Sequence, residues 1–284
     1  MKAQPECIVC AFRQALNTAR IVSRDPRIHA AVLARLASRT RLTDLRQTPA
    51  GLSQTVYRTV TEITGNKDPY TRIRRDTNRA AMKLLPQLLR FIRSSRDPLK
   101  TACKLAVAGN IIDLGIGHGF DLARDVRAIL KRDFTIDAYD DFKRELKPGR
   151  RLLYIGDNSG EIVFDRVLIE RLTAAGVHTT FVVKSAPIIN DATLTDARMV
   201  GMTRIVPVIT TGSDDIGIYW PRVSAEFKRA LRAADFIIAK GHGNFETCVG
   251  RRGNYYFMLK AKCDVVAAEL KVQLGDLVFA HHNR

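Results

Sequence analysis

The sequence predicts an α/β protein with an α-helical region, residues 1–145, followed by an α/β region, residues 146–284, whose mostly parallel sheet has helices on both faces. Two observations support this class. Apolar residues recur every three to four positions through roughly the first 120 residues, which is typical of amphipathic helices. After a turn signal at residues 147–149, short strand-like runs alternate with helical segments, and this alternation indicates parallel strands covered on both faces.

The helices of the first region have well-marked starts. Aspartate or threonine followed by proline occurs at residues 25–26, 48–49, 68–69 and 97–98. Such side chains accept a hydrogen bond at a helix N-cap, and proline fits the first helical position because its missing N–H has no partner there. Each pair therefore predicts a helix start, and Gly65 predicts the end of the helix that opens at residue 49.

The elements of the second region alternate along the chain. Helical spacing covers residues 162–175, 192–200 and 223–233. Runs rich in β-branched or apolar residues predict strands, and they cover residues 151–155, 179–183, 204–208, 236–239, 256–260 and 265–268.

The charge of the chain is strongly basic, with a formal net charge of +17. Such a field concentrates anions, which could be phosphorylated substrates or nucleic acid. The basic residues are spread along the chain without a polybasic tail, so a nucleic-acid surface and a merely solvated basic surface both stay open. We expect no membrane span and, since residues 1–10 lack an apolar signal region, a cytoplasmic protein. The oligomeric state is not predicted.

The sequence predicts no disulfide framework, because the number of cysteines, five, is odd and they are scattered along the chain. Cys7 and Cys10 form a single CxxC pair. The pair could be a redox couple, half of a metal site, or two buried thiols on a helix.

Chemistry-bearing side chains follow the strand predicted at 151–155. Asp157, Asn158, Ser159 and Glu161 lie within a six-residue segment that has glycines at positions 156 and 160. Oxygen donors of this kind suit Mg²⁺ or Mn²⁺, and the N-terminus of the next helix favours a phosphate. The alternative is an ordinary turn in which Ser159 caps that helix.

Two further segments follow the strands at 179–183 and 236–239. In the first, Asp191 could bind a metal, and Lys184 could meet a phosphate. Asn190 or Asp191 could instead cap the next helix. In the second, Lys240 precedes a glycine turn at residues 241–243, which could cradle a phosphate or be a plain turn. Because ligands of α/β sheets bind at the carboxyl ends of strands, we expect the three segments to converge.

Other motifs give weaker indications of function. The glycines at residues 115–119 lack the GxGxxG spacing of a dinucleotide loop. The six histidines show no HxxxH or HExxH pattern, and we expect His281 and His282 to be solvated in a C-terminal tail.

Several motifs, in order along nearly the whole chain, resemble the DUF89 family, also called the ARMT1-like or damage-control phosphatase family, in its archaeal–bacterial branch with an N-terminal CxxC. The motifs that carry the resemblance are CIVC at 7–10, DPYTRIRRDTNRAA at 68–81, AVAGNIIDLG at 106–115, GDNSGEIVFDRVLIERL at 156–172, VVKSAPIINDATLTDA at 182–197, IIAKGHGNFET at 237–247 and MLKAKCDVVA at 258–267.

The resemblance implies a helical N-terminal part, a Rossmann-like α/β part, and a phosphatase that uses Mn²⁺, Co²⁺, Ni²⁺ or Mg²⁺. By the same resemblance Asp157, Asn158 and Asp191 would hold the metal, Lys240 with Asn244 and Glu246 would form the family's KGxGN(Y/F)E motif, and Asn110 and Asp113 would lie near the site. The chain departs from the family pattern at His242 (usually Gln), Phe245 (usually Tyr), Arg74 (expected Lys) and Asp264 (commonly Pro).

The sequence therefore predicts a metal-dependent phosphatase for a small phosphorylated metabolite, either a sugar phosphate or a nucleotide-related compound, with metabolite damage control as a role. The predicted catalytic residues are Asp157, Glu161 and Lys240, and the predicted substrate-binding residues are Asn110, Asp113, Lys184, Asn190, Asn244 and Glu246. A nucleic-acid-binding protein and a carboxyl methyltransferase, a role proposed for a distant branch of the family, are the alternatives.

Overall fold

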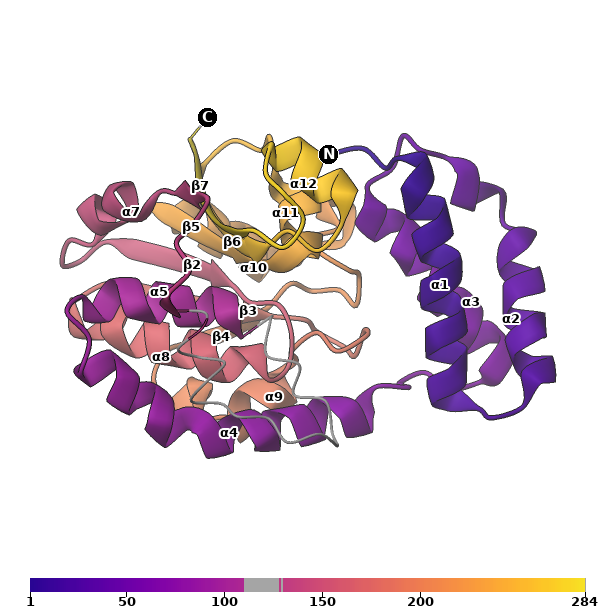
Figure 1. Cartoon of the computed structure of the whole chain (residues 1–284), viewed down its shortest axis with the longest axis horizontal. Coiled ribbons are helices and arrows are strands. Elements are labelled where there is room, and N and C mark those ends of the chain that lie inside the picture. The colour runs from indigo at the N-terminus through magenta and orange to yellow at the C-terminus, as the bar shows by residue number, and fades with distance from the viewer. Residues whose placement is uncertain (110–127, 129, 284) are drawn as a thin grey trace.

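The computed structural model describes residues 1–109, 128 and 130–283. Helices α1 (Pro5–Val22), α2 (Pro26–Ala37) and α3 (Pro49–Thr64) pack together at one end of the molecule, with the 3-10 helix η1 (Thr40–Thr43) between α2 and α3 (Figure 1). Small side chains of α1, such as Ala15, face larger ones from α2 and α3, such as Leu36 and Val56. We call α1–α3 the helical unit.

Three of the four predicted caps are confirmed. The side chains of Asp25, Thr48 and Asp97 accept backbone hydrogen bonds at the starts of α2, α3 and α5 (Pro98–Ala108). The prediction at residues 68–69 was wrong, because α4 (Thr71–Arg93) begins two residues later. Asp68 instead accepts hydrogen bonds from Thr71 Oγ1 and from Arg74.

A seven-stranded sheet forms the rest of the molecule. Its order is β1-β7-β6-β5-β2-β3-β4, and every neighbouring pair is parallel except β6 with β7. The strands are β1 (Ile136–Asp137), β2 (Arg151–Ile155), β3 (His178–Val183), β4 (Val208–Thr210), β5 (Phe236–Lys240), β6 (Asn254–Lys260) and β7 (Leu277–Asn283).

Helices cover both faces of this sheet, as predicted. Alternate residues of β2 point to opposite faces, since the side chains of a strand alternate. Tyr154 joins the core beneath α4, α5, α7 (Tyr139–Glu145), α8 (Glu161–Ala174) and α9 (Leu194–Met199). Leu153 and Ile155 join the core beneath α10 (Ala225–Ala233), α11 (Gly241–Cys248) and α12 (Asp264–Leu270). The predicted fold class is therefore confirmed.

The helices of the first half of the chain divide between two environments. Helices α1–α3 contact one another, whereas α4 and α5 pack against α8 on the face of the sheet (Figure 1). The boundary between residues 145 and 146 stays a prediction. In the part of the chain that the structure describes, no helix has both the length and the apolar character needed to cross a membrane.

Three local predictions in the second half need correction. The run at 204–208 gives the 3-10 helix η2 (Met202–Arg204), and β4 begins only at Val208. Residues 265–268 belong to α12 rather than to a strand. His281 and His282 lie in β7 and not in a tail, and the His281 ring stacks on Tyr256 with 4.4 Å between ring centroids.

Candidate active site

The loops that follow β2 and β3 are joined by their backbones. Asn158 and Asp191 form an isolated antiparallel bridge. Ser159 N donates to Asn190 O at 2.8 Å, and Ala192 N donates to Asp157 O at 2.8 Å. The two predicted metal-binding segments therefore converge at the carboxyl ends of neighbouring parallel strands, where ligands of such sheets bind.

Neither loop uses its polar residues as plain helix caps. Helix α8 has Gly160 at its N-cap, with a φ of 79°, so Ser159 is not the cap. Helix α9 has Thr193 at its N-cap, in a capping box with Asp196, so Asn190 and Asp191 are not caps either. The helix-cap alternative is thus wrong for Ser159, Asn190 and Asp191.

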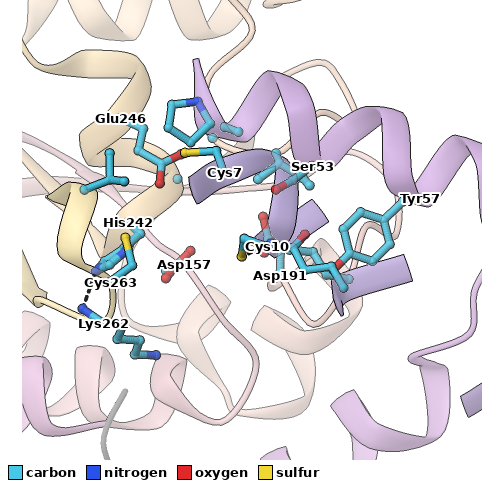
Figure 2. A pocket seen from close by; sticks show the side chains of 18 of the residues that line it. Cys7, Cys10, Ser53, Tyr57, Asp157, Asp191, His242, Glu246, Lys262 and Cys263 are labelled. Atoms are coloured by element: carbon cyan, nitrogen blue, oxygen red, sulfur yellow. Dashed lines mark hydrogen bonds between the residues drawn. The ribbon is translucent and has the colours of Figure 1, made fainter. Parts of the chain in front are cut away.

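A cavity of about 530 Å³ opens above these loops. Asp157, Asn158, Asn190 and Asp191 line it, together with side chains of α1 and α3. Figure 2 shows Asp157 between His242, Cys263 and Lys262 on one side and Cys10 and Asp191 on the other. The cavity therefore lies between the helical unit and the strand ends, and its volume suits a metabolite-sized ligand.

The backbone at Gly241 comes very close to Asp157. A Cβ atom at Gly241 would lie only 1.8 Å from Asp157 Oδ2, and the φ of 75° at Gly241 also disfavours a side chain. The first turn of α11 therefore fixes the place of the Asp157 carboxylate.

Three carboxyl groups meet here, of which Glu161 and Asp191 are buried and Asp157 is half-buried. Burial, followed by the charge of Asp191, raises the pKa of Asp157. Burial and the charge of Asp157 raise the pKa of Glu161, and burial raises the pKa of Asp191 despite the nearby Lys184 ammonium. Groups that resist ionisation for this reason are favourable ligands for a cation, which would compensate both burial and mutual repulsion.

The Asn158 amide lies at the centre of this group. Its Nδ2 donates to Asp157 Oδ2 at 3.0 Å and to Glu161 Oε1 at 2.8 Å. Glu161 Oε2 has no hydrogen-bond partner among the described residues. Glu161 does not line the cavity, so it is placed to hold the Asn158 amide from behind.

Among the described residues, no three His, Cys, Asp or Glu side chains are gathered as a metal site by themselves. The predicted set, Asp157, Asn158 and Asp191, has two carboxylates and one amide oxygen. Mg²⁺ and similar ions are commonly bound by one or two carboxylates, with water and substrate phosphate filling the other positions. The residues present thus fit a divalent ion that is shared with a phosphorylated substrate.

The two predicted lysines are buried and engaged. Lys240 Nζ donates to Asp165 Oδ1 and to Ala106 O, both at 2.7 Å. Although burial alone would lower it, the pKa of Lys240 is raised by Asp165 and Glu161. Lys184 Nζ donates to Gly217 O and lies 3.7 Å from Asp191 Oδ2. Neither lysine lines the cavity, so their contact with phosphate stays a prediction.

Of the remaining predicted residues that the structure describes, Asn244 supports a loop and Glu246 lines the cavity. Asn244 Nδ2 donates to Gly156 O and Lys240 O, both at 2.9 Å, and therefore braces the loop after β2. Glu246 lines the cavity, and burial raises its pKa to about 8. Asn110 and Asp113 lie outside the described residues.

Lys262 is a cavity residue that the site prediction missed. It follows β6, whose carboxyl end lies at the same edge as that of its parallel neighbour β5. Lys262 lines the cavity, and its charge lowers the pKa of Asp157 and of Glu161 in opposition to burial. The strand-end rule could have found it in the KAKC segment at 260–263.

Comparisons with known proteins match this chain over nearly its whole length. A family model described as the damage-control phosphatase ARMT1-like domain matches residues 3–278. A damage-control phosphatase of Pyrococcus horikoshii is 34% identical, over 98% of this chain and 97% of that protein. One of Archaeoglobus fulgidus is also 34% identical, over 98% of each chain. The crystal structure of a DUF89 family protein of P. horikoshii superposes with a TM-score of 0.92, at 34% identity and 99% coverage of both chains.

Proposed function

This chain belongs to the damage-control phosphatase ARMT1-like family, and we propose that it is a divalent-metal-dependent phosphatase acting on a small phosphorylated metabolite. The observation that carries the proposal is the convergence of Asp157, Asn158 and Asp191, from two joined loops, on one cavity. Sugar phosphates and nucleotide-related phosphates are the substrate classes that we expect.

The cation would be held by Asp157, Asn158 and Asp191. When bound, it supplies positive charge that stabilises the negative charge of the transferring phosphoryl group. Mn²⁺, Mg²⁺, Co²⁺ and Ni²⁺ are the candidates, since oxygen donors dominate the set.

The other groups of the cavity would orient the substrate. Lys262 offers a cation to the phosphoryl oxygens. Glu246, with a pKa of about 8, holds a proton at neutral pH and can donate a hydrogen bond to a substrate oxygen. Lys240 and Asp165 form a buried pair behind the carboxylates and support the position of Glu161.

The attacking group is a water molecule or the Asp157 carboxylate. We favour water, because a carboxylate that binds a cation has part of its charge committed to that cation. Glu161 lies outside the cavity wall, so it orients Asn158 in this scheme and does not take the proton itself.

The test is a screen of phosphorylated metabolites with Mn²⁺, Mg²⁺, Co²⁺ and Ni²⁺, with an EDTA control. We expect Asp157→Asn to lower kcat by about 100-fold or more, because an electrostatic group at the reacting centre contributes on this scale. Asp140→Asn, on the exposed face of α7, is the matched control and should leave kcat unchanged.

The same screen examines Lys262. We expect Lys262→Gln to raise KM for the phosphorylated substrate more than it lowers kcat, since it removes a binding charge. Full turnover by Asp157→Asn, or activity that persists in EDTA, would contradict the proposal. Activity that requires a methyl donor would point to the methyltransferase alternative.

A further inference from the structure

A second cavity, of about 550 Å³, lies on the other side of α3 from the catalytic one. Helix α3 lines it from Ala50 to Arg58, and the loop from Asp215 to Arg222 lines it from the opposite side. Ala50 and Ile216 line both cavities, so they form the wall between them. We call this second cavity the arginine pocket.

The arginine pocket is strongly cationic. Its lining includes four arginines and one carboxylate, and the arginines are Arg41, Arg58, Arg222 and Arg251. Arg41 and Arg251 form no ion pair within 4 Å among the described residues, although Arg41 lies near enough to Asp44 for its charge to lower the pKa of that carboxyl group. A concave site with this excess of guanidinium groups favours an anion, and the guanidinium fork matches the geometry of phosphate and carboxylate groups.

The single carboxylate of the pocket positions two of the arginines. Asp215, whose side chain is 5% exposed, lies 3.3 Å from Arg58 Nη2 and 3.4 Å from Arg222 Nη1. These distances exceed the roughly 2.7–2.9 Å of a strong charge-assisted hydrogen bond. Arg222 Nη2 also donates to Asp214 Oδ1 at 3.0 Å. Because a guanidinium group has five N–H donors, both arginines keep donors for a ligand.

Aromatic side chains form the other wall. Trp220 Nε1 donates to Thr247 O at 2.9 Å, which fixes the indole ring. The Arg251 guanidinium stacks over this ring at 4.6 Å from its centroid. Tyr219 is 48% exposed. Flat guanidinium and aromatic surfaces of this kind bind nucleobases by stacking.

We propose that the arginine pocket binds a nucleoside phosphate. Inorganic phosphate would use the arginines but not the aromatic wall, and an apolar ligand would leave the arginines unpaired. A nucleotide satisfies both, and its size suits the volume of the pocket. A pocket of about 550 Å³ has room for a mononucleotide, whereas a nucleic-acid strand requires a longer groove.

The experiment measures binding of AMP by isothermal titration calorimetry, in EDTA so that any cation-dependent binding in the catalytic cavity is removed. Ribose 5-phosphate lacks the base, and adenosine lacks the phosphate. We expect AMP to bind at least 10-fold more tightly than either fragment. Equal affinity for AMP and ribose 5-phosphate, or no binding at millimolar AMP, would overturn the proposal.

Variants then locate the site. Arg41→Gln and Tyr219→Ala, both at exposed positions, should each weaken AMP binding at least 10-fold while leaving thermal unfolding unchanged. Arg93→Gln removes one exposed charge at the end of α4 and is the matched control, which should bind AMP normally. If Arg41→Gln and Arg93→Gln behaved alike, binding would be a non-specific effect of charge and the proposal would be wrong.

The Asp157→Asn variant distinguishes a failure of this proposal from a failure of the proposed function. AMP binding should persist in that variant, because Asp157 does not line the arginine pocket. Loss of AMP binding in Asp157→Asn, with normal binding in Arg41→Gln, would show that AMP binds in the catalytic cavity, and the proposal would be wrong. Preference for an RNA oligonucleotide over AMP would also overturn the proposal, whatever the phosphatase assay shows.

Discussion

His242 shows how burial can hold one residue in a single charge state. Its Nε2 lies 2.7 Å from Lys260 O and 3.0 Å from Lys262 N, and this one nitrogen either donates to the carbonyl or accepts the N–H, according to the tautomer. Burial lowers the pKa of His242 to about 4, from an ordinary value of 6.5. The folded protein therefore holds the ring neutral at pH values where the unfolded chain would take up a proton.

The expected consequence is a loss of stability in mild acid that His242→Gln abolishes. The unfolded chain gains a proton as pH falls through 6.5, whereas the folded chain does so only near 4, so the wild type loses up to roughly 3 kcal/mol across that interval. Glutamine does not titrate, and its amide can donate to Lys260 O and accept from Lys262 N.

Urea unfolding at pH 7 and pH 4.5 measures this difference. Other titrating groups are common to both proteins, so they cancel when the two unfolding free energies are subtracted. Parallel pH profiles for wild type and His242→Gln would show that His242 is not held neutral.

Among the helices, α4 is connected by one side chain, that of Asn78, both to the loop after β2 and to α9, which follows the loop after β3. Asn78 Nδ2 donates to Asp196 Oδ1, and Asn78 Oδ1 accepts from Gly160 N, each at 2.7 Å. Asn78 is fully buried. A helix outside the sheet thus supports the turn that follows Asp157 and Asn158.

We expect Asn78→Ala to lower the free energy of unfolding by about 2–4 kcal/mol, because it leaves a buried carboxylate and a backbone N–H without their partner. It should also lower kcat, since the turn at Gly160 loses its support. Thr77→Ala is the control on the same helix, because the Thr77 hydroxyl bonds only within α4. Unfolding in urea and turnover at saturating metal measure both effects, and equal stability of the two variants would contradict the expectation.

The elements that could be predicted from sequence are those set by local chemistry. The caps at Asp25, Thr48 and Asp97 depend on neighbouring residues alone. The strand expected at 204–208 begins late because Pro207, which cannot donate to a ladder, lies just before it. The run at 265–268 is too short for its period to separate a strand from a helix.

The candidate site could likewise be predicted from sequence only where it depends on the local order of residues. The strand-end rule located Asp157, Asn158 and Asp191, because it depends only on the order of strands and loops. It could not show that Lys240 and Lys184 are buried, because their partners Asp165, Ala106 and Gly217 lie 33 to 134 residues away in sequence. Their engagement is a property of the folded chain and leaves no local pattern.

For the whole molecule, binding of a cation and folding should be linked. The fold raises the pKa of Asp157, Asp191 and Glu161 by bringing their carboxyl groups together away from water, so a bound cation favours the folded chain over the unfolded one. A ligand at 100 times its Kd stabilises the native state by about 2.7 kcal/mol. We therefore expect saturating Mn²⁺ to raise Tm by about 4–5 °C.

Differential scanning calorimetry with and without Mn²⁺ measures this shift. Asp157→Asn and Asp191→Asn should lose most of it, whereas Glu269→Gln, an exposed control on α12, should keep it. A shift of the same size in all four proteins would place the cation elsewhere on the chain.

The contact between Gly241 and Asp157 also limits which homologous proteins can carry out the same reaction. Since even a methyl group at position 241 would overlap the carboxylate, no substitution there is a conservative one. A homologous sequence with any other residue aligned to this glycine must hold its acid differently or have given up the reaction. The presence of glycine at this single position can thus be used to sort newly sequenced homologues before any of them is purified.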